Sequence, residues 1–289
     1  MNIDEIIEKA LKEDIGEGDI TSLTIIKNKI PGMARLMIKD HGILAGIPVA
    51  ERVFYKVDPS LRLKVFKNDG DAVVAGDIVL EVKGDVQSIL AAERLVLNFI
   101  QRLSGIATFT SQVVSELKGL KTSVLDTRKT TPNLRELEKY AVKTGGGVNH
   151  RMGLYDMMLI KDNHVDYAGG IIEVMKILQD YKMANKNPNI PVEIEVRNFD
   201  ELKIVLESGK DLVDRIMLDN FSVKDLAAAV LMIDGRFETE ASGGIQLSNI
   251  RKYAETGVDF ISVGALTHQF KSLDMNLKIV PKSTLSDGW

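Results

Sequence analysis

From about residue 120 onward, short apolar runs alternate with segments of helical periodicity, and this rhythm limits the fold more than any other feature. The apolar runs predict strands at 123–126, 157–161, 192–197, 215–219, 237–242 and 259–263. Helices are predicted between them, at 133–144, 169–183, 199–208, 223–233 and 247–256. This alternation is typical of βαβ units and a parallel sheet. Six strands closed by one more suit a (β/α) barrel, and an open doubly wound sheet is the alternative.

Residues 1 to about 105 follow a different pattern, in which short alternating strands are mixed with helices. A helix is predicted over 3–12, and strands are predicted at 34–40, 61–67 and 77–84. A long helical stretch follows over 88–117, and we expect Gly105 to interrupt it because glycine weakens a helix interior. The chain is therefore expected to form an α/β protein of two domains, as its length of 289 residues also suggests.

Composition excludes several classes of protein. The chain has no cysteine, so disulfides, cysteine-ligated metal sites and a cysteine nucleophile are excluded. Its net charge of −4 argues against nonspecific binding of nucleic acid. No apolar run approaches the roughly 20 residues of a membrane span, and the charged N-terminal segment lacks the apolar core of a signal peptide. We expect a cytoplasmic protein that has neither a membrane nor a nucleic acid as its partner.

The charges are unevenly distributed. Residues 126–161 carry seven basic and four acidic side chains, so this window is +3 and the rest of the chain is −7. Arg135, Lys139 and Lys143 are spaced as one face of the predicted helix, which favours an ordinary solvent-exposed role for these three. The other cations of the window predict a small anionic ligand.

Charged residues also alternate along two predicted strands. Glu193, Glu195 and Arg197 share one strand face, and Glu238, Glu240 and Ser242 share another. In a barrel such a face lines the interior, and the C-terminal strand ends converge on one mouth, where these enzymes place their sites. Buried carboxylates are costly unless they are paired. We therefore expect a charged network inside the barrel, with Lys161 and Arg197 as the partners of the carboxylates.

Three motifs could bind anions at that mouth. Arg128 and Lys129 follow a strand in DTRKTTP (126–132), and an arginine fork suits a carboxylate or a phosphate. His150 and Arg151 follow three glycines in KTGGGVNHRMGLYD (143–156), where backbone N–H groups can face an anion. Lys161 ends a strand and could be an anion ligand or a Schiff-base nucleophile. The ordinary alternatives are an exposed loop, a structural histidine and an ion-paired lysine.

Further strand ends carry groups for a metal and a phosphate. Glu195 and Asp219 could hold a hydrated Mg²⁺ ion or sugar hydroxyls. Ser-Gly-Gly (242–244) and Val-Gly-Ala (263–265) precede predicted helices and could offer backbone N–H groups to a phosphate. A separate segment, 69–85, is similar to part of a lipoyl or biotinyl carrier domain, but Lys83 lacks the flanking pattern of a carrier lysine.

Taken in order, these motifs resemble the quinolinate phosphoribosyltransferase family over about residues 10–280. The motifs are DIGEGDIT, AAERLVLNFIQRLSGIAT, DTRKTTP, KTGGGVNHRMGLYDMMLIKDNH, EIEV, IMLDN, EASGGI and DFISVGALTH. The resemblance implies an N-terminal α/β sandwich domain, residues 1–105 joined by 271–289, and an open TIM-like α/β barrel at 106–270. It also implies that a final strand near 274–280 returns to the N-terminal domain.

The activity that the resemblance implies is transfer of phosphoribosyl from 5-phosphoribosyl 1-pyrophosphate to quinolinate in NAD biosynthesis. Decarboxylation accompanies the transfer, the products are nicotinate mononucleotide, pyrophosphate and CO₂, and Mg²⁺ assists without an organic cofactor. The implied quinolinate pocket consists of Arg94, Arg128, Lys129, His150, Arg151 and Lys161. The implied phosphoribosyl-pyrophosphate side consists of Glu195, Asp219, Ser242, Gly243, Gly244, Val263, Gly264 and Ala265. Catalytic roles fall to Lys129, Lys161, Glu195 and Asp219, with Glu195 and Asp219 also holding Mg²⁺ directly or through water.

The resemblance further implies a homodimer, with Arg94 reaching the neighbouring subunit's site, and leaves a higher oligomer open. Two other activities remain possible: a paralogue of the molybdate-transport-associated type with another substrate, and a Schiff-base aldolase using Lys161. The chain differs from the family pattern in two places, a longer 209–220 stretch and an extended 184–191 loop, and both are expected to lie away from the mouth.

Overall fold

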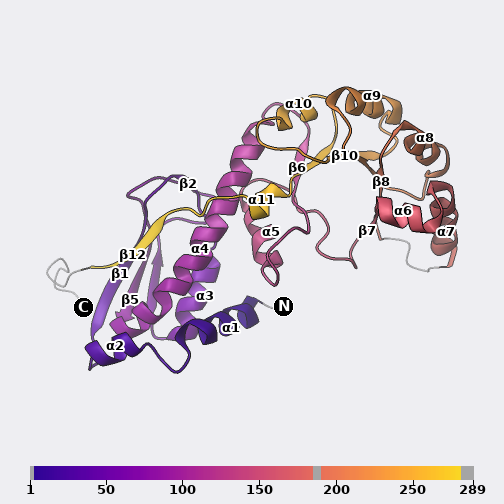
Figure 1. Ribbon diagram of the computed structural model, residues 1–289. Helices are drawn as coiled ribbons and strands as arrows, with labels where there is room; N and C mark the ends of the chain where they lie inside the picture. The colour runs from indigo at the N-terminus through magenta and orange to yellow at the C-terminus, as the bar shows by residue number, and fades with distance from the viewer. Residues whose placement is uncertain (1–2, 185–189, 281–289) are drawn as a thin grey trace. The chain divides into compact units, whose positions relative to one another are not determined.

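The computed structural model describes residues 3–184 and 190–280, which form two compact units (Figure 1). The first unit consists of the chain up to Ser111, Thr130–Gly146 and the chain from Leu266 onward. The second unit consists of Gln112–Lys129 and Gly147–Ala265. Part of the loop expected at 184–191, and the end of the C-terminal segment 271–289, lie outside the described residues.

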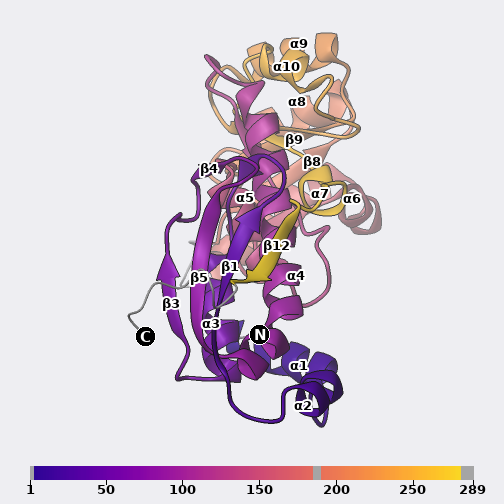
Figure 2. The same cartoon turned by 90° about the vertical axis from the view of Figure 1, so that its left-hand side faces the viewer.

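The first unit is built on an antiparallel sheet with strand order β12-β1-β5-β3. Its strands are β1 (Pro31–Ile38), β3 (Arg62–Val65), β5 (Ile78–Asp85) and β12 (Met275–Ile279). The last strand runs beside β1, with Leu36 opposite Leu277, so the chain end near 274–280 does return to this sheet. Helices α3 (Ile47–Val57) and α4 (Val86–Ser115) cover one face of the sheet (Figure 2). A small ribbon pairs β2 (Gly42–Ile43) with β4 (Ala72–Val73).

The helices of this unit correct two expectations. Sequence patterning missed α3. This helix begins after Gly46, which has a left-handed backbone, and Pro48 lies in its first turn, where proline is favourable. Helix α4 runs without a break through Gly105, so the predicted interruption is wrong. A Cβ at Gly105 would overlap the carbonyl oxygen of Lys271 and approach Ser272 Cα to 2.9 Å. The glycine is therefore explained by a close approach between two chain segments. Two further helices, α1 (Ile3–Ile15) and α2 (Ile20–Ile25), come before β1 in the chain.

Helix α5 (Arg135–Thr144) also differs from the charge-based prediction. Lys143 is exposed as expected, but Arg135 is half-buried and Lys139 is fully buried. The idea of one solvated basic face is therefore wrong for Lys139. Helical spacing shows which residues share a face, but it does not show which structures later cover that face.

The second unit confirms the predicted alternation. Its six parallel strands have the order β6-β11-β10-β9-β8-β7. They are β6 (Ser123–Leu125), β7 (Met158–Ile160), β8 (Val192–Val196), β9 (Arg215–Asp219), β10 (Glu238–Ser242) and β11 (Phe260–Ser262). Among the described strands, β6 and β7 end the series and do not pair with each other, so the barrel is open. Val148 makes an isolated parallel bridge beside Leu125 of β6.

Helices follow the strands and lie on the outer side of the curved sheet (Figure 1). They are α6 (Asp162–Ala168), α7 (Ile171–Ala184), α8 (Phe199–Ser208), α9 (Val223–Ile233) and α10 (Ile250–Ala254). The short α11 (Ala265–His268) follows β11 in the chain, and from Leu266 onward it belongs to the first unit. Polar caps fix where several begin: Ser222 Oγ accepts the amide of Asp225 at the start of α9, 3.2 Å away. All five residues of β8 are buried, as expected for a strand covered on both faces. No described helix combines the length and apolarity that crossing a bilayer requires.

Candidate active site

The basic loop after β6 is held at its start by the strand. Asp126 is fully buried and follows β6, and its amide donates to the Val148 carbonyl at 3.1 Å. Arg128 and Lys129 come next and are exposed, as predicted for loop residues at the C-terminal end of a strand. Lys129 N donates to Thr127 Oγ1 at 3.0 Å, which makes a tight turn there. The strand thus presents two cations to solvent at its carboxyl end.

The segment that carries His150 and Arg151 lies beside the same strand end. Val148 N donates to the Val124 carbonyl at 2.8 Å, and His150 N donates to Asp126 Oδ1 at 2.8 Å. Arg151 is 9% exposed and donates from Nη1 to the Met157 carbonyl at 3.2 Å. Burial lowers the pKa of Arg151, and the like charge of Arg128 lowers it further. Two guanidinium groups held within electrostatic reach of each other form a site for an anion.

Lys161 lies at the N-cap of α6, directly after β7, and is exposed. Its amide donates to His164 Nδ1 at 2.9 Å, so His164 caps this turn. The positive charge of Lys161 lowers the pKa values of Glu195 and Asp219 in part, which places it close to both carboxylates. The charge of Lys161 therefore acts on both carboxylates at the mouth, and its pairing with them stays a prediction.

Glu195 and Asp219 end neighbouring strands, β8 and β9, and form an acidic pair at the mouth. Glu195 is 8% exposed; burial first, and then the Asp219 carboxylate, raises its pKa to about 7. Burial also raises the pKa of Asp219, and the negative charge of Asp162 adds to this, against a hydrogen bond from Asn220 that lowers it. The two carboxyl groups are thus partly removed from water beside each other, and their oxygen donors are of the kind that Mg²⁺ takes.

The glycine-rich turn after β10 is organised around Asn220. Asn220 has a left-handed backbone (φ 55) and its amide donates to the Ser242 carbonyl at 2.8 Å. Its side chain donates from Nδ2 to Asp219 Oδ2 at 2.5 Å. Gly243 has φ 102, and a Cβ there would overlap Asn220 Oδ1. Gly244 is exposed with φ 62, so this turn has the backbone freedom that an anion cradle needs.

The last strand end lies next to the first. Val263 is buried and donates its amide to the Leu125 carbonyl at 2.9 Å, which connects β11 with β6. Gly264 and Ala265 follow directly and are partly exposed. Within this unit the structure therefore brings the predicted groups to the carboxyl ends of adjacent strands. Arg94 belongs to the other unit, where it is an exposed residue of α4.

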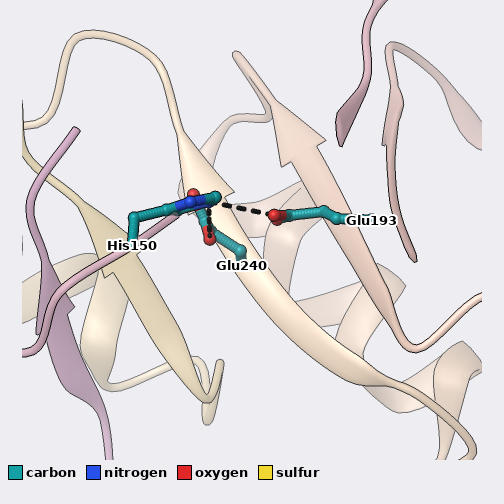
Figure 3. Close-up of side chains that lie close together, drawn as sticks. All are labelled: His150, Glu193 and Glu240. Atoms are coloured by element: carbon teal, nitrogen blue, oxygen red, sulfur yellow. Dashed lines mark ion pairs between the residues drawn. The ribbon is translucent and has the colours of Figure 1, made fainter. Parts of the chain in front are cut away.

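The charged interior network exists, but its members differ from those expected. His150 Nε2 lies 2.9 Å from Glu193 Oε2 and 3.3 Å from Glu240 Oε2 (Figure 3). Arg215 Nη1 lies 3.3 Å from Glu240 Oε2. Burial by itself would lower the pKa of His150, but hydrogen bonds to the two carboxylates raise it to about 9. Arg215 could not be recognised from sequence pattern, because it starts its strand and its partners lie far from it along the chain.

The prediction that Arg197 pairs with the interior carboxylates is wrong. Arg197 donates from Nη2 to Glu201 Oε1 at 2.6 Å and to Asp166 Oδ1 at 3.0 Å, outside the barrel interior. It follows the last residue of β8, where the chain already turns toward α8, so the strand alternation no longer applies to it. Lys83 lies within β5, opposite Met33 and Arg62, and not at the tip of a hairpin as a carrier lysine must.

An open parallel barrel with cations and a carboxylate pair at its carboxyl end defines an enzyme of the class that acts on small anionic substrates. Family models described as "Quinolinate phosphoribosyl transferase, N-terminal domain" and "C-terminal domain" match residues 19–104 and 106–278. The chain therefore belongs to the quinolinate phosphoribosyltransferase family. Its fold is an N-terminal α/β sandwich and an open TIM-like α/β barrel, as the resemblance implied.

Known relatives agree with this membership. A "Nicotinate-nucleotide pyrophosphorylase [carboxylating], chloroplastic" of Arabidopsis thaliana is 44% identical over 98% of this chain and 84% of its own length. A "Probable nicotinate-nucleotide pyrophosphorylase [carboxylating]" of Bacillus subtilis is 40% identical over 96% of this chain and 94% of its own. The solved nicotinate-nucleotide pyrophosphorylase of Francisella tularensis superposes with a TM-score of 0.89 at 42% identity, covering 96% of both chains.

Proposed function

We propose that the mouth of the barrel is the site where this chain transfers phosphoribosyl to quinolinate with decarboxylation, in NAD biosynthesis. The enzyme class follows from family membership. The observation that supports the placement is the division of the mouth into two electrostatic halves. On one side burial, and then the charge of Arg128, lowers the pKa of Arg151; on the other side Glu195 and Asp219 form a carboxylate pair.

The basic half suits quinolinate, which is a dianion. We assign Arg128, Lys129, His150, Arg151 and Lys161 to this pocket, and Arg94 to the pocket of a neighbouring subunit in a homodimer. Guanidinium groups bind carboxylates through paired N–H donors, and a second arginine offsets the cost of removing a dianion from water. Lys129 and Lys161 are the catalytic cations, because both extend from exposed positions at the strand ends.

The acidic half suits the phosphoribosyl donor. Glu195 and Asp219 would hold Mg²⁺, directly or through water, and the ion would neutralise charge on the pyrophosphate. Ser242, Gly243, Gly244, Val263, Gly264 and Ala265 would bind the 5-phosphate through backbone N–H groups. No organic cofactor is needed in this scheme.

The reaction needs no covalent nucleophile from the protein. The bond from ribose C1 to the pyrophosphate oxygen breaks, and positive charge develops on the sugar, where Glu195 and Asp219 stabilise it. The quinolinate nitrogen attacks C1, and the resulting pyridinium accepts the electron pair when the 2-carboxylate leaves as CO₂. A proton then takes the position of that carboxylate. One such oriented charge contributes about 2.7–4 kcal/mol, by analogy with a single oxyanion-hole donor.

A direct assay tests the assignment. Purified protein with quinolinate, 5-phosphoribosyl 1-pyrophosphate and Mg²⁺ should release CO₂ and nicotinate mononucleotide in equal amounts. Equal turnover of plain nicotinate would contradict the substrate assignment. Borohydride trapping of a carbonyl substrate on Lys161 would instead support the aldolase alternative, and turnover of a different aromatic acceptor would support the paralogue.

The homodimer can be tested by complementation. Arg94→Ala and Lys161→Ala are each expected to be inactive, and mixed dimers should regain part of the activity through hybrid sites. Verified subunit exchange without recovery would reject the role of Arg94 across an interface. Sedimentation would show whether dimers assemble further. For localisation we propose the cytoplasm, with a Bacillus subtilis relative as the support, although plant relatives carry mitochondrial and chloroplastic names; cell fractionation tests this.

A further inference from the structure

A buried cluster of charges lies inside the barrel, around residues to which the proposed reaction gives no role. Glu193 on β8 and Glu240 on β10 are both fully buried. Their strands are separated by β9, yet their carboxylates converge on the ring of His150, which enters from the loop beside β6 (Figure 3). The distances from His150 Nε2 are 2.9 Å to Glu193 Oε2 and 3.3 Å to Glu240 Oε2.

Arg215 on β9 completes the cluster. Its guanidinium lies 3.3 Å from Glu240 Oε2 and 4.0 Å from the centre of the Phe260 ring, and 2.8 Å from the outer Glu238. The donor atoms of His150, Glu193 and Glu240 lie within 4.8 Å of one another, which is close enough for a metal ion. However, Arg215 already supplies a positive charge at this place, so the cluster is explained as an ion-paired network.

The protein engages both nitrogens of the His150 ring. Nε2 faces the two glutamates, and Nδ1 accepts the amide N–H of Arg151 at 2.7 Å. That hydrogen bond forms with the neutral ring that carries its proton on Nε2, and it is lost in the cation, in which Nδ1 is also protonated. Nε2 carries a proton in both forms. The contact with Glu193 therefore persists in either charge state. His150 thus has its ring held on one edge by the interior and on the other by the backbone of Arg151.

This arrangement fixes the peptide that carries Arg151. The amide of His150 donates to Asp126 Oδ1 at 2.8 Å, and the amide of Arg151 donates to the ring. The side chain of Arg151 is held as well, because its Nη1 donates to the Met157 carbonyl at 3.2 Å. Rotation of the His150 ring away from the glutamates would remove the acceptor of the Arg151 amide and release this peptide.

We propose that Glu193 and Glu240 are positioning residues that act through His150 to hold Arg151 toward the quinolinate carboxylates. This inference rests on the proposed function, because it takes Arg151 as a quinolinate ligand. Within the quinolinate pocket to which His150 is assigned, its ring supports the neighbouring arginine, while its two nitrogens face Glu193 and the Arg151 amide. The glutamates themselves are too deeply buried to touch a ligand.

Single substitutions test the proposal against a matched control. Glu193→Gln and Glu240→Gln preserve shape and remove the carboxylate charge. Each should raise the KM for quinolinate at least tenfold and leave the KM for the phosphoribosyl donor within twofold of the parent. Glu240→Asp keeps a carboxylate on a side chain that is one methylene shorter, so its KM for quinolinate should lie between that of the parent and that of Glu240→Gln.

Glu238→Gln is the control, because Glu238 lies on the same strand and contacts the same Arg215, but its side chain is 54% exposed. It should leave both KM values within twofold.

The split between the two KM values separates positioning from general damage. Folded Gln variants whose quinolinate KM is unchanged, or whose two KM values rise equally, would overturn the proposal. A second measurement needs neither substrate nor the Gln variants. With ¹⁵N-labelled histidine, the Nε2–H of His150 in the parent protein should exchange slowly with water, and the signal is assigned by its loss in His150→Asn.

Rapid exchange at that nitrogen would overturn the proposal even if a Gln variant fails to fold. The two measurements also separate this inference from the proposed function. A parent protein that fails to convert quinolinate would reject the proposed function, whereas the histidine exchange experiment would still report whether the glutamates hold the ring.

Discussion

The amide of His150 donates to the carboxylate of Asp126 across 2.8 Å and so connects the end of β6 to the segment that carries Arg151. Asp126 is fully buried, so its carboxylate does not have water as an alternative partner. The hydrogen bond therefore fixes two anion-binding segments, the one after β6 and the one after Val148, relative to each other within the barrel.

Replacing Asp126 with alanine should be costly for that reason. Asp126→Ala leaves the N–H of His150 without its buried acceptor, and the expected loss of unfolding free energy is about 1–3 kcal/mol. Asp126→Asn retains an oxygen acceptor and should lose less. Urea unfolding of the three proteins measures the difference. Equal stability of the alanine variant and the parent would show that this hydrogen bond does not hold the segment.

The glycines after β10 should differ in their tolerance of alanine. Gly243 and Gly244 both have positive φ, but only at Gly243 would a Cβ meet a neighbour, Asn220. Gly244→Ala should lose about 1–2 kcal/mol from the left-handed backbone alone. Gly243→Ala adds steric overlap and should lose roughly 1–3 kcal/mol more. Thermal unfolding of the pair checks the order, and a Gly244 variant that is less stable than the Gly243 variant would contradict it.

Stability without Mg²⁺ should depend on pH through Glu195. Its pKa is raised from 4.5 to about 7, first by burial and then by the Asp219 carboxylate. Between these two values the folded protein retains a proton that the unfolded chain has lost, so the free energy of unfolding should fall as the pH rises. Glu195→Gln should flatten this slope. Denaturant unfolding at pH 4.5, 6 and 7.5 measures it, with Glu238→Gln as an exposed control. An unchanged slope in Glu195→Gln would place the titrating group elsewhere.

Gly105 should not tolerate alanine, although it lies inside a helix. Alanine would raise helix propensity by about 1 kcal/mol, but its Cβ would overlap the Lys271 carbonyl. Because that neighbour is backbone and cannot rotate away, we expect a net loss of about 1–3 kcal/mol, the usual cost of overpacking. Asn98→Ala, at an exposed position of the same helix, is the control and should be neutral or slightly stabilising. A Gly105→Ala protein with a raised melting temperature would contradict the close approach.

Local sequence pattern was sufficient to predict much of the barrel. The strand at 215–219 and the helix at 223–233 have the predicted bounds, because apolar periodicity and polar caps act within a few residues. The positions of Arg128, Lys161, Glu195 and Asp219 at strand ends follow from the same periodicity. In a parallel sheet, residues at the carboxyl ends of strands must converge whatever the loops between them do.

The sequence by itself therefore determined the family, the order of elements in the barrel and the groups at its mouth. Only the tertiary structure decided how the interior charges are paired: Glu193 and Glu240 contact His150 and Arg215, while Arg197 turns outward to Asp166 and Glu201. It also decided that Lys139 is buried and that Gly105 accommodates the chain near Lys271. Periodicity predicts which face of a helix or strand a residue occupies. The groups that the residue contacts on that face come from distant segments of the chain, and only folding brings those segments within a few ångströms.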